Sequence, residues 1–70
     1  MADLVECRSD FEYAQRPVAF YWQGQRLIVI ELISQIQTPA GYSFRVRSEE
    51  LGIFELNYDL ITDQWSVQQL

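Results

Sequence analysis

The chain of 70 residues contains no histidine and no lysine, and Cys7 is its only cysteine. Histidine is the most common general acid or base, and a lysine amine is the group that forms Schiff bases. A lone cysteine cannot close an intramolecular disulfide, and the lack of histidine nearly excludes a zinc site. We therefore expect a protein that is not an enzyme and that uses neither a metal nor another cofactor.

Long hydrophobic runs are also missing. The longest unbroken apolar runs, such as residues 27–30, are far shorter than the ~20 residues that a membrane-spanning helix requires. The first residues have neither a basic region nor an apolar stretch of the length found in signal peptides. A single thiol is compatible with a reducing compartment. These features predict a cytoplasmic location and no membrane partner.

Positive charge is scarce, because five arginines face ten aspartates and glutamates and the net charge is -5. Such a charge repels phosphate backbones at long range. The composition therefore argues against general nucleic-acid binding, although it leaves room for a local arginine patch.

Apolar residues make up 49% of the chain and aromatic residues 14%, which is enough for one compact core. A chain of this length forms a single domain and buries roughly 60% of its unfolded surface. We place that β domain at residues 17–70 and regard residues 1–16 as a separate N-terminal segment, partly disordered in one interpretation.

The N-terminal segment carries two local signals. Val5 and Cys7 alternate with polar residues, which predicts a short edge strand. Ser9 and Glu12 have the spacing of a capping box, which predicts one or two helical turns that Pro17 would end. Fraying of the terminus is the alternative interpretation.

From Pro17 onward the pattern predicts strands. Gln23-Gly24 is suited to a two-residue hairpin turn, and this turn would place Phe20 opposite Leu27 and Val18 opposite Val29. The strand after the turn is apolar on both faces, so it should be central. We expect it to bend near Glu31 and to end at the turn formed by residues 38–41.

Alternation is clearest in the last three predicted strands. Pairing Val46 with Phe54 also sets Phe44 opposite Leu56 and Tyr42 opposite Tyr58. On the other face the same register sets Arg45 opposite Glu55, a complementary charge pair. After a turn at residues 59–63, Trp65 should lie opposite Tyr58 and Val67 opposite Leu56.

Together these segments predict an all-β fold, with a short N-terminal helical turn as an optional addition. The architecture is a five-stranded antiparallel meander that curls into a half-barrel or small barrel, which protects the sheet edges. Its core should consist mainly of the aromatic residues Phe20, Trp22, Phe44, Phe54, Tyr58 and Trp65.

This arrangement resembles a small bacterial domain family of unknown function, whose members occur alone or as a C-terminal appendage of Y-family DNA polymerase-like proteins. The resemblance spans residues 16–67 and rests on Arg16-Pro17, Phe20, Trp22, Gly24, Val29, Phe44-Arg45-Val46-Arg47, Phe54-Glu55-Leu56, Tyr58-Asp59 and Trp65. The chain departs from the family pattern at Ile36, where tryptophan is common, and in a shorter loop at residues 38–41. The resemblance implies a link to DNA repair or damage tolerance.

Four residues are candidates for a binding site. Arg45 and Arg47 project from one face of a strand and could grip a phosphate or another anion. The simpler interpretation, which we favour, is a solvated sheet face with Arg45 paired to Glu55. Tyr21 and Arg26 share the outer face of the first hairpin, where they could form a surface stack or part of a binding patch.

The apolar stretch at residues 27–33 leads to the main functional prediction. A sheet that is apolar on both faces must bury its second face against something, either the N-terminal segment or a partner. We predict a non-catalytic module that binds another protein or itself. The alternative is an accessory domain that makes local nucleic-acid contacts through Arg45, Arg47 and Tyr21.

Carboxylate pairs are the only remaining candidates for catalysis. Glu49 with Glu50, and Asp59 with Asp63, both fall at predicted turns, where acidic residues are ordinarily solvated. We regard a hydrolase that uses them as remote.

Overall fold

The computed structural model describes residues 4–8 and 16–70, which form one antiparallel sheet with its strands in sequence order. The strands are β1 (Val5–Arg8), β2 (Arg16–Trp22), β3 (Gln25–Thr38), β4 (Gly41–Ser48), β5 (Gly52–Asp59) and β6 (Gln64–Gln69). The predicted all-β meander, curled into a half-barrel, is confirmed. There are six strands instead of the expected five, because β1 joins the sheet.

β1 pairs with β2, and Val5 is buried in the core. The N-terminal segment therefore contributes a strand to the sheet. The helical turn predicted after Ser9 falls in residues 9–15, outside the described residues, and Arg16 already belongs to β2.

The hairpin between β2 and β3 has the predicted turn. Gln23 and Gly24 both have positive φ angles, 49° and 80°, as a two-residue turn of the primed type requires. Phe20 pairs with Leu27 as expected. This ladder ends at Ala19 and Ile28, so it does not reach the expected pair of Val18 with Val29.

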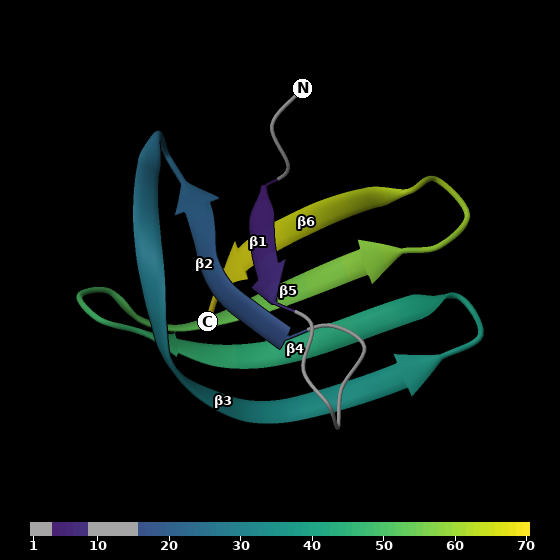
Figure 1. Ribbon diagram of the computed structural model, residues 1–70, viewed down its shortest axis with the longest axis horizontal. Helices are drawn as coiled ribbons and strands as arrows, with labels where there is room; N and C mark the ends of the chain where they lie inside the picture. Colours follow the sequence, from purple (N-terminus) through teal and green to yellow (C-terminus); the bar gives the residue numbers. More distant parts are fainter. Residues whose placement is uncertain (1–3, 9–15) are drawn as a thin grey trace.

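β3 is the long strand that curls the sheet. Its first four residues pair with β2, and from Val29 onward it pairs with β4. The register shifts between Val29 and Glu31 and again between Leu32 and Ser34. Such bulges bend a strand and increase its twist. Figure 1 shows the result: β2 and the first part of β3 cross the strands β4, β5 and β6 at a steep angle. The predicted bend near Glu31 corresponds to the first shift.

The registers of β4, β5 and β6 are those that the sequence predicts. Val46 pairs with Phe54, and Tyr58 pairs with Trp65. These pairs direct their side chains to the concave side of the sheet, because paired residues of an antiparallel ladder share a face.

The core fills this concave side. Phe20 of β2 lies against Phe54 of β5, with ring centroids 4.8 Å apart, and Trp22 contacts Phe54 at 5.4 Å. The first hairpin therefore covers the sheet formed by the later strands. The buried apolar cluster consists of Val5, Phe20, Leu27, Phe44, Val46, Phe54 and Leu56. Trp22, Tyr42 and Trp65 pack against it while remaining partly exposed.

Candidate interaction surface

The second half of β3 has a free side. From Val29 to the end of the strand, β3 pairs with β4 only, and within the described residues no ladder covers its opposite side beyond Ile28. In Figure 1 this part of β3 forms the lower margin of the sheet. An uncovered strand presents unpaired amide and carbonyl groups that can pair with another chain. β3 is therefore central where it meets β2 and an edge strand afterwards.

Three exposed isoleucines belong to this part of β3. The exposed fractions of Ile30, Ile33 and Ile36 are 57%, 40% and 58%. Ile30 and Ile33 fall within the two register shifts, which explains why the strand turns them away from the core. We call Ile30, Ile33 and Ile36, with the uncovered backbone of residues 29–38, the isoleucine edge.

The bulges also explain which apolar residues of β3 reach the core. Leu27, Val29 and Leu32 pack on the concave side, whereas Ile28 is more than one-third exposed on the outer face. A shallow hollow of about 450 Å³ follows the edge and is lined by Leu32, Ile33, Ser34, Gln35 and Gln37.

Arg45 and Arg47, the predicted anion-binding pair, each face a carboxylate. Arg45 forms the expected ion pair with Glu55 at 3.5 Å, and Arg47 pairs with Glu31 at 3.0 Å. All four side chains are substantially exposed, so each pair contributes only about 0–1 kcal/mol to stability. Their positive charges are nevertheless largely neutralised on the outer face of the sheet.

Arg26 forms a shorter, two-point contact with its carboxylate partner than Arg45 or Arg47 does. Its guanidinium donates two hydrogen bonds to Glu6 of β1, at 2.7 and 2.9 Å. The hydrogen bond from Arg26 lowers the pKa of Glu6, and Glu6 in turn raises the pKa of Arg26. Tyr21 pairs with Arg26 across the hairpin, and it adds a smaller lowering of the Glu6 pKa through its own hydrogen bond. The structure thus brings Tyr21 and Arg26 together on the first hairpin, whereas Arg45 and Arg47 both lie on β4.

Two arginines that were not singled out from the sequence lie next to each other. Arg8 and Arg16 are directly paired across β1 and β2, and within the described residues neither has an ion pair. They line a hollow of about 290 Å³ where β2 and β3 diverge, together with Glu31. No sequence signal pointed to this pair, because the register shift between Glu6 and Cys7 sets it.

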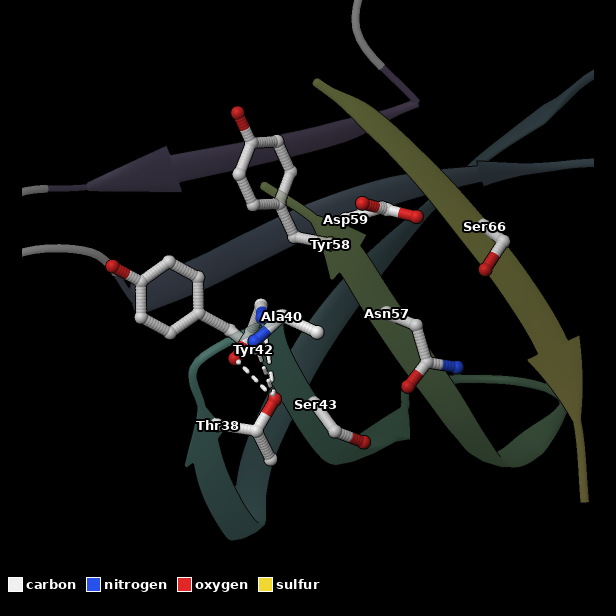
Figure 2. A pocket seen from close by; sticks show the side chains of 9 residues that line it. Thr38, Ala40, Tyr42, Ser43, Asn57, Tyr58, Asp59 and Ser66 are labelled. Atoms are coloured by element: carbon white, nitrogen blue, oxygen red, sulfur yellow. Dashed lines mark hydrogen bonds between the residues drawn. The ribbon is translucent and has the colours of Figure 1, made fainter. Parts of the chain in front are cut away.

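A third hollow, of about 370 Å³, lies at the other end of the sheet (Figure 2). Figure 2 shows Ser43, Asn57 and Ser66 on three neighbouring strands, pointing away from the rings of Tyr42 and Tyr58. Asp59, at its rim, accepts backbone hydrogen bonds from residues 61 and 62 and so stabilises the turn before β6. The residues that line the hollow include hydroxyl groups and the Asp59 carboxylate but no arginine.

All four residues of the two carboxylate pairs are exposed. Glu49 and Glu50 lie exposed in the turn between β4 and β5, while Asp63 accepts a hydrogen bond from the Tyr58 hydroxyl. Among residues 4–8 and 16–70, no three acidic or cysteine side chains are grouped as metal ligands would be. The same residues include no helix that could cross a membrane.

Comparisons with protein-family models, with curated proteins and with solved structures find no match for this chain. The resemblance to the polymerase-associated family therefore stays a prediction.

Proposed function

We propose that this domain is a non-catalytic protein-interaction module and that the isoleucine edge of β3 is its binding surface. The observation that carries the proposal is the coincidence of three exposed isoleucines with an uncovered strand. Soluble domains usually blunt such edges with lysine, proline or a covering element. Between residues 29 and 38, however, Glu31 is the only charged residue, and neither lysine nor proline occurs.

These three isoleucines contribute little to the stability of the folded domain. None of the three belongs to the buried cluster or packs against it, whereas their neighbours Val29 and Leu32 do. Exposed apolar residues that gather in one place commonly mark a site of protein contact. A partner strand added to this edge would satisfy its free backbone groups, while the isoleucines would supply apolar contact.

The proposal can be tested by capture from an extract of cells that express the chain. The baits are the wild type, an Ile33→Lys, Ile36→Lys double variant, and an Ile61→Lys control in the turn before β6, where Ile61 is 85% exposed. We expect at least one protein, which includes the chain itself, to be retained by the wild type and the control and lost with the double variant. An identical set of retained proteins for all three baits would contradict the proposal.

The nucleic-acid alternative has less support. Arg26, Arg45 and Arg47 each face a glutamate, so binding a phosphate would require breaking an existing pair. Binding of short DNA at several salt concentrations tests this alternative, because phosphate contacts give a steep salt dependence. An affinity unchanged in an Arg45→Ala, Arg47→Ala double variant would end it.

A further inference from the structure

The amino-acid sequence at the C-terminal end of β3 is nearly palindromic. After the second register shift, Ser34-Gln35-Ile36-Gln37-Thr38 pairs without interruption with residues 41–45 of β4. Gln35 and Gln37 flank Ile36 symmetrically, and a hydroxyl residue, Ser34 or Thr38, lies at each end. The segment carries no charge, and every residue in it is exposed.

We infer that a second copy of this chain occupies the isoleucine edge, with the two β3 strands paired antiparallel about Ile36. This inference rests on the proposed function and names the partner. A twofold axis through this point places Ile36 opposite the partner's Ile36 and Gln35 opposite the partner's Gln37. Ser34 then faces the partner's Thr38. The β3–β6 sheets of both copies would join into one continuous sheet.

Each pair in this register is chemically matched. Isoleucine meets isoleucine and amide meets amide, and cross-strand side-chain pairs stabilise antiparallel sheets. The Thr38 hydroxyl, opposite the partner's Ser34, is already hydrogen-bonded within the turn to Ala40 and Gly41. Alternate residues of an edge strand direct their amide and carbonyl groups outward, so a strand in this position also completes the ladder. A symmetric interface needs a surface that is complementary to itself, and this segment meets that condition.

No unpaired charge on β3 opposes the approach of the two edges. The nearest acidic residue on β3 is Glu31, and Arg47 neutralises it. The net charge of -5 still makes two copies repel at long range, so added salt should strengthen the dimer.

The opposite margin of the sheet, β6, lacks these features. Its outward residues Gln64, Ser66 and Gln68 are polar, and Trp65 and Val67 face the core. None of the exposed large apolar residues lies within β6.

Sedimentation equilibrium of charge variants at position 36 tests the inference. We expect reversible dimers of the wild type, and dimers weakened at least about tenfold by Ile36→Lys or by Ile36→Glu, because each variant sets like charges opposite each other. Residue 36 lies opposite residue 36 of the second copy, so a mixture of the two variants places lysine opposite glutamate. Mixing them should therefore restore dimers. Ile61→Lys is the control that should dimerise like the wild type.

Thermal melts show whether each variant folds; Ile36 is 58% exposed, so both should. A monomeric wild type would overturn the inference, and so would dimers of charge variants as strong as the wild type or a mixture that stays monomeric. If the capture experiment nevertheless identifies a different protein whose retention depends on Ile33 and Ile36, the proposed function stands and only the second copy is wrong. If capture also fails, both are wrong.

Discussion

β3 and β4 lie side by side in the same sheet, but their apolar residues are placed in opposite ways. β4 has a ladder on each side, and its Phe44 and Val46 are almost completely buried. β3 loses its second neighbour after Ile28, and Ile30, Ile33 and Ile36 face solvent. Burial accounts for the apolar residues of β4 through folding alone. The isoleucines of β3 need another explanation, and we assign them to association.

The largest difference between the two regions should appear on truncation of a large side chain. Phe54, which pairs with Val46 of β4, is fully buried and contacts two other rings. Phe54→Ala should lower the free energy of unfolding by about 3–5 kcal/mol, enough to unfold much of so small a domain. Ile36→Ala on β3 should change it by less than about 0.5 kcal/mol at low protein concentration. Urea unfolding of both variants measures this, and similar losses would break the comparison.

The second-largest difference between β4 and β3 should come from adding one methyl group to each strand. A Cβ atom on Gly41 of β4 would lie 1.8 Å from the backbone oxygen of Tyr58. Gly41→Ala should therefore force β4 and β5 apart and cost about 1–3 kcal/mol. Ser34→Thr adds a methyl group to the exposed part of β3 and should leave stability nearly unchanged. Thermal melts of both variants measure the two effects. A Gly41→Ala variant as stable as the wild type would show that β4 and β5 can accommodate a Cβ atom at this position, which would contradict the expected difference.

Removing a hydroxyl group tests polar contacts in the same way. Ser48, at the end of β4, is buried; its hydroxyl donates to the Gly52 carbonyl oxygen at 2.9 Å and accepts from the Leu51 amide at 3.0 Å. Ser48→Ala removes both of these hydrogen bonds at a buried position and should cost about 1–2 kcal/mol. Ser34→Ala on β3 removes an exposed hydroxyl and should cost little. Equal effects in chemical denaturation would contradict the assignment.

The smallest expected effect concerns the ion pair on the outer face. The pKa of Glu6 is lower in the folded protein than in the unfolded chain, because Arg26 donates hydrogen bonds to it. The pair therefore stabilises the fold above the unfolded pKa, and this stabilisation is lost as the pH falls through the folded pKa. Glu6→Gln should slightly lower the melting temperature at pH 7, and the difference should disappear in acid. Glu50→Gln, in an exposed turn, is the control, and a difference independent of pH would argue against this cause.

The sequence predicts β4, β5 and β6 well because a single register satisfies both faces. Val46 with Phe54 on one face and Arg45 with Glu55 on the other exclude a one-residue slip, which would reverse every side chain. The turn at Gln23-Gly24 is equally specific, because both residues must adopt positive φ angles.

The sequence is less informative about β3 and β1. Bulges arise where a strand must bend between two neighbours, and no residue pattern in β3 marks their positions. The stretch at residues 27–33 thus appears apolar on both faces, without indicating that Ile30 and Ile33 turn outward. The pair of Arg47 with Glu31 depends on these shifted registers, and the pair of Arg26 with Glu6 depends on how β1 pairs with β2. Neither pair could be predicted, whereas Arg45 with Glu55 could.

The central claim is that the isoleucines of β3 serve association and not folding. Melting temperatures of the wild type and of Ile36→Lys, measured over a wide range of protein concentrations, test it most directly. We predict a wild-type value that rises with concentration and an Ile36→Lys value that stays constant at the wild-type limit for dilute protein. A wild-type value independent of concentration, with a lower value for Ile36→Lys, would contradict the claim.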